Sequence, residues 1–246
     1  MKISAISDVH LMRDFDDSAR MFEKFISNPL VQNSDQVILL GDIFDCMVGN
    51  KQKYFSDHSA AIKLVQGLVD KLVANGGKVV FIEGNHDFHL RKIFRERFPA
   101  IEYCEEIYVI EDQTKKLFFA HGDSVEIDNP GHQLFRKLVK NPVFEFVLSQ
   151  LIPYEVVRNV GESWSRKSRK YNELTEAENV LVREKFRQTA ARFWIKESCH
   201  LLVLGHSHLA DNYTANGMQY LNNGFFPQTQ TFSYFENGQG RLVSIN

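Results

Sequence analysis

The apolar positions in the first third of the chain follow two alternating spacings. Residues 2–7, 36–40 and 78–82 are short apolar runs that contain β-branched side chains, which predicts three buried strands. Between them, residues 18–30 and 59–77 repeat apolar side chains at helical spacing. Strands and helices that alternate in this way predict an α/β fold.

Further apolar runs continue this pattern toward the C-terminus. Residues 116–120 and 200–205 have the length and composition of strands. In the tail, residues 218–224, 230–238 and 240–245 are typical of strands joined by Asn-Gly and other glycine-containing turns. We expect the strands of this tail to pair in antiparallel fashion.

A long helical segment separates residue 123 from the strand near residue 200. Residues 143–152 are apolar around most of a helix, and residues 163–170 are basic. We predict one domain over residues 1–246, with a helical insertion, or lid, over about 129–198. This insertion is basic, whereas the remainder of the chain is acidic.

Composition narrows the class of protein. The 246 residues are 43% hydrophobic and 24% charged, as in a soluble globular protein. A formal net charge of -2 argues against a nucleic-acid partner. The three cysteines are scattered, which excludes a disulfide framework and favours a reducing compartment. We find no signal sequence and no run of ~18 apolar residues. We expect a cytoplasmic protein, with contact at the inner face of the cytoplasmic membrane left open.

Polar side chains gather where the predicted strands end. The carboxyl ends of strands in an α/β sheet meet at a common crevice, where sites usually form. Each motif alone is most often a solvated turn, but five of them at five strand ends predict one site. Its candidate residues are Asp8, His10, Asp42, Asp45, Asn85, His86, Asp87, His121, Asp123, His206 and His208.

The residue types in this set favour metal binding. Aspartate, asparagine and histidine without cysteine suit divalent Mn, Fe or Zn. Seven ligands are more than one tetrahedral ion uses, whereas two ions roughly 3.5–4 Å apart that share a carboxylate use all of them. We predict two divalent ions, manganese first among the candidates, and Asp42 as the bridge. Such a pair lowers the pKa of a bridging water, so that hydroxide can attack phosphorus.

The motifs "SDVHL", "GDIFD", "GNHD", "HGD" and "GHSH" together resemble the calcineurin-like metallophosphoesterase superfamily. The resemblance spans residues 7–208 and implies a four-layer α-β-β-α sandwich with a dinuclear site. It assigns one ion to Asp8, His10, Asp42 and His208. It assigns the other ion to Asp42, Asn85, His121 and His206.

The same resemblance implies roles around the two ions. His86 would face the phosphate, either stabilising charge on its oxygens or protonating the leaving group. Asp87 would orient His86. Asp45 and Asp123 would hold the metal ligands in their productive orientation.

The insertion resembles that of bacterial UDP-2,3-diacylglucosamine hydrolases, which cut the pyrophosphate of a lipid A precursor to give UMP and a lipid monophosphate. This resemblance implies that the lid covers acyl chains, while polar side chains hold the phosphates and the nucleotide. The candidate substrate-binding residues are Asp128, Arg136, Arg166, Lys167, Arg169 and Lys170.

One departure keeps an alternative open. Those lipid hydrolases commonly carry arginine where this chain has His86. The alternative is a related branch that acts on another phosphodiester or a phosphomonoester. A nuclease is disfavoured because the acidic remainder of the chain repels a polyanion. A non-catalytic scaffold is disfavoured because every expected ligand position is filled.

Overall fold

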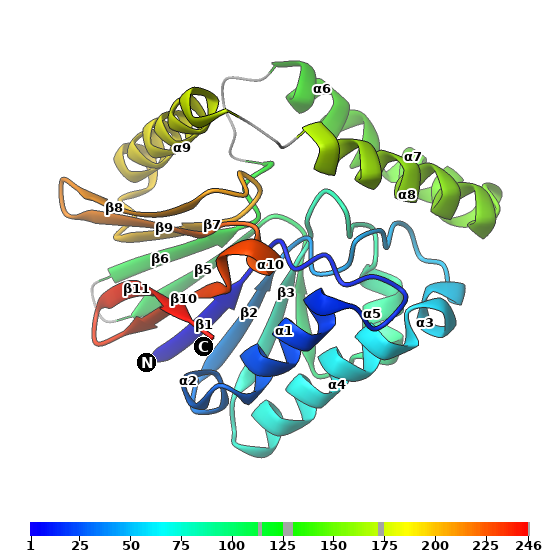
Figure 1. Cartoon of the computed structure of the whole chain (residues 1–246), viewed down its shortest axis with the longest axis horizontal. Coiled ribbons are helices and arrows are strands. Elements are labelled where there is room, and N and C mark those ends of the chain that lie inside the picture. The colour runs from blue at the N-terminus through cyan, green and yellow to red at the C-terminus, as the bar shows by residue number, and fades with distance from the viewer. Residues whose placement is uncertain (113–114, 125–129, 172–174, 246) are drawn as a thin grey trace.

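Two β-sheets lie face to face, and helices cover their outer faces (Figure 1). This computed structural model describes residues 1–112, 115–124, 130–171 and 175–245. The layers therefore run α-β-β-α, which confirms the predicted four-layer sandwich.

The first sheet has six strands in the order β11-β10-β1-β2-β3-β4. Strands β1 to β4 are parallel, and the β10–β11 hairpin adds to β1 in antiparallel fashion. The bounds are β1 Lys2–Ile6, β2 Gln36–Leu40, β3 Lys78–Ile82, β4 Ile101–Cys104, β10 Thr231–Glu236 and β11 Gln239–Ser244.

The second sheet has five strands in the order β5-β6-β7-β9-β8. Its central strands β6, β7 and β9 are parallel, and β5 and β8 are antiparallel edge strands. The bounds are β5 Ile107–Asp112, β6 Lys115–Ala120, β7 Leu201–Leu204, β8 Ala210–Ala215 and β9 Met218–Asn223. The parallel strands of both sheets end beneath the same group of helices (Figure 1).

Alternation along the strands explains how each sheet packs. In β2, Ile38 and Leu40 face the second sheet, whereas Val37 and Leu39 pack against the outer helices. A strand buried on both faces is an unbroken apolar run. The helices on the outer face of the first sheet are α1 Asp17–Ser27, α2 Pro29–Gln32, α3 Lys53–Asp57, α4 Ser59–Ala74 and α5 Arg91–Arg97, and the short α10 Phe226–Thr229 follows β9.

The helical insertion divides into two parts. Helix α9, Glu176–Glu197, packs Phe186 and Ala190 against the second sheet and forms its outer layer. We call the other elements the lid helices. They are α6 Pro130–Val139, α7 Pro142–Phe146, the π-helical turn η1 Val147–Leu151 and α8 Tyr154–Tyr171. The lid helices lie over the strand ends (Figure 1), so α9 belongs to the sandwich although it falls inside the predicted lid range.

The tail differs in part from the expectation. Strands β10 and β11 form the predicted antiparallel hairpin, with Asn237 and Gly238 at positive φ in its turn. Strand β9, however, runs parallel to β7 in the other sheet, where Leu221 joins the core between the sheets. Within the described ranges, no helix is both long and apolar enough to cross a membrane.

Candidate metal centre

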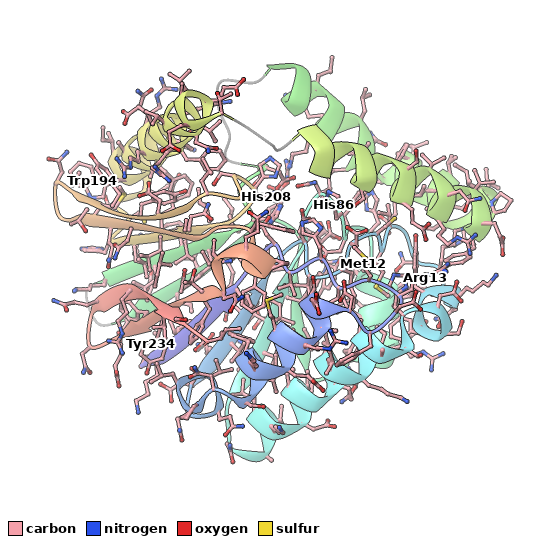
Figure 2. All side chains as sticks on the ribbon, in the orientation of Figure 1. Met12, Arg13, His86, Trp194, His208 and Tyr234 are labelled. Atoms are coloured by element: carbon pink, nitrogen blue, oxygen red, sulfur yellow. The ribbon has the colours of Figure 1, made fainter. Side chains whose placement is uncertain are left out.

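Five loops that follow β1, β2, β3, β6 and β7 bring polar side chains to one place. Figure 2 shows His86 and His208 near each other between the strand ends and the lid helices. We call the seven side chains with predicted ligand roles the metal centre. They are Asp8, His10, Asp42, Asn85, His121, His206 and His208.

The backbone is unusual at five of these seven residues. Asp8, His10, Asp42, His206 and His208 all have positive φ, between 52° and 66°. Such a conformation costs ~1–3 kcal/mol per non-glycine residue and tends to persist at functional sites. These strained turns point neighbouring polar side chains toward one place, so the strain is part of how the fold builds the centre. Aspartate and histidine adopt positive φ more often than most residue types, but the sequence does not mark which of them do so.

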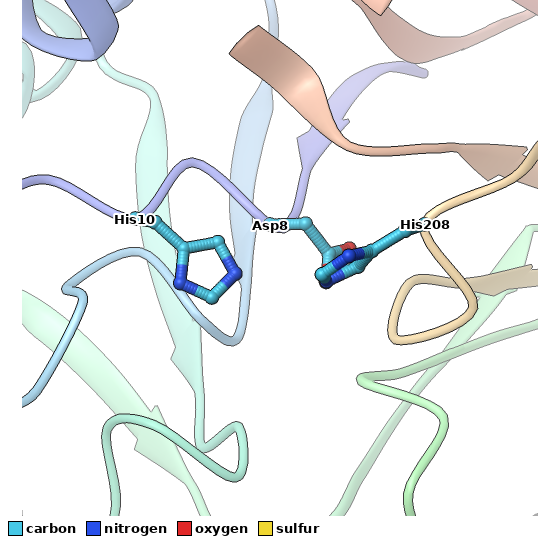
Figure 3. Close-up of side chains that lie close together, drawn as sticks. All are labelled: Asp8, His10 and His208. Atoms are coloured by element: carbon cyan, nitrogen blue, oxygen red, sulfur yellow. The ribbon is translucent and has the colours of Figure 1, made fainter. Parts of the chain in front are cut away.

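The first group of side chains contains Asp8, His10 and His208. Figure 3 shows Asp8 between the two histidines. Nε2 of His208 lies 3.2 Å from Oδ1 of Asp8, and the rings of His10 and His208 are 5.6 Å apart. Nε2 of His10 is buried, has no hydrogen-bond partner among the described residues, and lies 3.8 Å from Oδ2 of Asp42. A buried ring nitrogen without a hydrogen-bond partner, close to a carboxylate, fits a metal ligand.

The second group contains Asn85, His121 and His206. Oδ1 of Asn85 lies 3.0 Å from Nε2 of His121 and 2.8 Å from Nδ1 of His206. Nδ1 of His121 donates to the carbonyl of Leu40 at 3.0 Å, since a carbonyl can only accept. When the ring is neutral, as it must be to bind a metal ion, the lone pair of His121 is therefore on Nε2, which faces the centre.

Asp42 connects the two groups. Its Oδ2 lies 3.4 Å from Nε2 of His121, on the side of the second group, and 3.8 Å from Nε2 of His10. Any side chain at Gly84 would collide with Oδ1 of Asp42, so this position requires glycine. The arrangement fits a carboxylate shared by two ions.

The electrostatics of the centre favour cations. Burial opposes the charge of Asp42, but the imidazoles of His121 and His86 hold the pKa of this carboxyl well below its usual range. Burial lowers the pKa of His121, but the field of Asp42 outweighs it and raises the value to about 10. The buried carboxylates thus draw positive charge. With nitrogen and oxygen donors and no thiolate in the set, Mn, Fe or Zn fit.

His86 lies beside the centre and points toward it. Its Nδ1 donates to the carbonyl of Asp45 at 2.8 Å, and its Nε2 is 4.0 Å from Oδ2 of Asp42. Burial lowers the pKa of His86, although the charge of Asp42 opposes that shift. The ring is therefore neutral near pH 7, with a free lone pair on Nε2 toward the space where a substrate would bind. The Asp45 carboxylate lies 3.3 Å from Nδ1 of His10, the orienting position predicted for it.

Asp87 organises the loop that carries Asp42. Its Oδ1 accepts from the backbone N–H groups of Asp42 and Gly84, each at 2.9 Å. Its Oδ2 accepts from Ile43 at 2.7 Å and Phe44 at 3.1 Å. The contact that orients the ring of His86 comes from the Asp45 carbonyl instead. Asp87 therefore acts on the site through the backbone of the Asp42 loop.

The predicted substrate contacts lie on the lid helices or just before them. Nε of Arg136 donates to Oδ2 of Asp123 at 3.0 Å, and a second nitrogen of Arg136 donates to Glu106 at 2.9 Å. Asp128 lies outside the described residues. The last turns of α8 carry four predicted residues whose side chains also lie outside the described part of the structure. These are Arg166, Lys167, Arg169 and Lys170.

A cavity of about 470 Å³ opens beside the metal centre. Its polar lining includes Asn85, His86 and His206. The lid helices supply an apolar wall that contains Val139, Phe144, Leu148, Ile152, Val157 and Val160. The apolar run at 143–152 was therefore a useful signal, because Phe144, Leu148 and Ile152 do face a cavity.

Two residues of the site were missed from the sequence. Ser165 of α8 donates to Oδ1 of Asp45 at 2.6 Å, and Lys140 forms a partly buried ion pair with Glu83. Serine within a basic stretch gives no sign of such a contact. The signal available was the spacing of Gly161 and Ser165, four residues apart, which places two small residues on one face of a helix.

Comparison with known proteins agrees with this geometry. The model of the family described as calcineurin-like phosphoesterase matches residues 1–210. A UDP-2,3-diacylglucosamine hydrolase of Aliivibrio fischeri is 28% identical over 217 residues, which cover 87% of this chain and 84% of that protein. The enzyme of the same name from Actinobacillus succinogenes is also 28% identical, with 82% of each chain covered. The chain therefore belongs to the calcineurin-like phosphoesterase family, as a metal-dependent phosphoester hydrolase.

Proposed function

We propose that this hydrolase cleaves the pyrophosphate of UDP-2,3-diacylglucosamine to give UMP and a lipid monophosphate, a step of lipid A biosynthesis. The observation that carries the proposal is the apolar cavity of about 470 Å³ that opens on the metal centre. Predominantly apolar pockets with a few polar groups at one end suit ligands of the same character. The relatives that bear this enzyme name cover most of the chain, which supports the same substrate.

In this proposal each side chain of the centre has a role. Asp8, His10, Asp42 and His208 hold one divalent ion, and Asp42, Asn85, His121 and His206 hold the other. Two bound dications, with manganese as our first choice, supply a hydroxide at neutral pH and neutralise charge on phosphate oxygens. The neutral ring of His86 presents Nε2 to the phosphate, where it can accept a proton or, once protonated, donate one to the leaving group.

We propose that the basic side chains that bind the diphosphate of the substrate belong to α8. Arg136 is already paired with Asp123 and Glu106, and Lys140 with Glu83. We therefore assign Arg136 to holding the lid helix α6 against the core next to the phosphate site. Arg166, Lys167, Arg169 and Lys170 are assigned to the phosphates and the nucleotide.

The surface of the lid helices supports contact with a membrane. Among the described residues there, six large apolar side chains have between 59% and 71% of their surface exposed. They are Leu134, Leu138, Val143, Phe146, Leu151 and Val160. Apolar side chains grouped on an amphipathic surface bind the headgroup region of a bilayer. We propose that the protein works at the inner face of the cytoplasmic membrane, where it can take a lipid-linked substrate.

The test compares a charge inside the cavity with one outside it. Leu148 lines the cavity, whereas Leu181 on α9 is 70% exposed. Leu148→Glu should raise the KM for UDP-2,3-diacylglucosamine at least 10-fold and leave hydrolysis of bis-p-nitrophenyl phosphate unchanged. Leu181→Glu should change neither. Equal loss on both substrates would reject the cavity as an acyl chamber and favour a soluble phosphodiester or phosphomonoester.

A further inference from the structure

A buried hydrogen bond joins the lid helix α8 to Asp45, which lies beside the metal centre. Ser165 is 1% exposed and donates from Oγ to Oδ1 of Asp45, which is 7% exposed, at 2.6 Å. This distance is in the short range of hydroxyl–carboxylate hydrogen bonds. Ser165 and Asp45 are 120 residues apart in the sequence, so the bond joins the lid to the loop that follows β2.

The same carboxylate oxygen also faces a predicted metal ligand. Oδ1 of Asp45 lies 3.3 Å from Nδ1 of His10, which fixes the proton of His10 on Nδ1. Nε2 of His10, the buried atom without a described partner, then keeps its lone pair toward the centre. Ser165, Asp45 and His10 therefore form a continuous path from the lid to the first ligand group.

The close approach of α8 depends on a second small residue. A side chain at Gly161 would collide with Sγ of Cys46, the residue next to Asp45. Glycine within a helix is less favourable than alanine, and here it lets α8 come near enough for Ser165 to reach Asp45. The first half of α8 is anchored elsewhere on the core, because Tyr154 donates to Asp57 at 2.7 Å and Lys53 pairs with Glu155.

We infer that Ser165 is a positioning residue, which couples docking of the lid helix α8 to metal binding at His10 through the Asp45 carboxylate. This inference rests on the proposed metal centre and not on the identity of the substrate. Coupling between two sites is reciprocal. A docked α8 therefore strengthens metal binding at the first group, and a bound ion there strengthens docking of α8 by the same factor.

The test measures metal binding without turnover. Chelator-stripped protein is titrated with Mn²⁺ by isothermal calorimetry. Loss of an outer hydrogen-bond partner typically weakens metal affinity 10–100-fold. Ser165→Ala should weaken one of two Mn²⁺ sites by about 10-fold and leave the other unchanged. Ser163→Ala, two positions earlier on the same helix, is the matched control and should bind both ions as the wild type does.

Two further variants distinguish this coupling from general damage. Gly161→Ala should weaken the same single site, because it moves α8 away from Cys46. In an Asp45→Ala background, which removes the acceptor, Ser165→Ala should have no additional effect, since both act through the Asp45 carboxylate. Mn²⁺ should also slow amide hydrogen exchange in α8 of the wild type, but not of Ser165→Ala.

The outcomes separate cleanly. A wild type that binds two Mn²⁺ ions while Ser165→Ala binds them equally well would overturn the coupling alone. Equal weakening of both Mn²⁺ sites in Ser165→Ala would also overturn the coupling, because the loss of affinity would then come from general unfolding of the protein. A wild type that binds no Mn²⁺ would overturn the metal centre and the coupling together.

Discussion

Replacing Asp87 tests how the chain holds the Asp42 loop. The carboxylate accepts four backbone N–H groups, from Asp42, Ile43, Phe44 and Gly84, at 2.7–3.1 Å. A buried donor left without a partner costs ~1–3 kcal/mol. Four such donors give roughly 4–12 kcal/mol, and water that enters the vacated space moves the result toward the lower end. We expect Asp87→Ala to lower the free energy of unfolding by about 4 kcal/mol.

The conservative variant should show half of this effect. In Asp87→Asn one oxygen remains to accept two N–H groups, while the amide nitrogen faces the other two donors. The expected loss is roughly 2–3 kcal/mol, for two unsatisfied donors at ~1–3 kcal/mol each with partial relief by water. Burial and the charge of Asp42 raise the pKa of Asp87 to about 7, so the comparison belongs at pH 8, where the carboxylate form dominates.

The assay is urea unfolding in excess chelator, followed by tryptophan fluorescence. Chelator removes any contribution from bound metal. Asp70 on α4, which accepts a hydrogen bond from Gln66 at 2.7 Å, is exposed, and Asp70→Ala should stay within about 0.5 kcal/mol of the wild type. If Asp87→Ala also unfolds within 1 kcal/mol of the wild type, its four hydrogen bonds do not hold the loop, and our reasoning is wrong.

Three other predictions concern the centre itself. His86→Ala should retain its metal content by elemental analysis and lose about 10²–10⁴-fold in turnover, the range for a general acid–base group; unchanged turnover would remove His86 from the reaction. Asp42→Ala should lose both ions, and a fully metallated variant would contradict the bridging role. Mn²⁺ at 100 times its dissociation constant should stabilise the wild type by about 2.7 kcal/mol per site, and the two sites together should raise Tm by ~10–20 °C over the chelated protein. A Tm that does not respond to Mn²⁺ would argue against a metal site built into the native fold.

The sequence was most informative where one physical rule acts alone. Buried strands such as β2 and β3 are continuous apolar runs, which predict strands directly. The aspartate, asparagine and histidine residues that follow these strands predict a site for divalent metal ions. Strands β4, β5 and β8 were missed, because they are edge strands with exposed, polar or mixed side chains. Their pairing comes from neighbouring strands rather than from their own composition.

The site was predictable in its residue types and not in its supporting contacts. The sequence motif predicts Asp8 and His10 as site residues. Their positive φ, and the lack of a described hydrogen-bond partner for Nε2 of His10, depend on the folded loops. Asp87 was expected to orient His86, whereas its carboxylate binds the backbone of the Asp42 loop. Such contacts join segments far apart in the sequence, so no local pattern encodes them.

The most direct test of the proposed function is Mn²⁺-supported turnover of UDP-2,3-diacylglucosamine, followed by phosphorus NMR, with bis-p-nitrophenyl phosphate as the reference substrate. We predict that the pyrophosphate signal is replaced by those of UMP and a lipid monophosphate, at a rate far above hydrolysis of the reference. Hydrolysis of the reference alone, with the lipid nucleotide left intact, would contradict the lipid assignment and leave only the dinuclear chemistry.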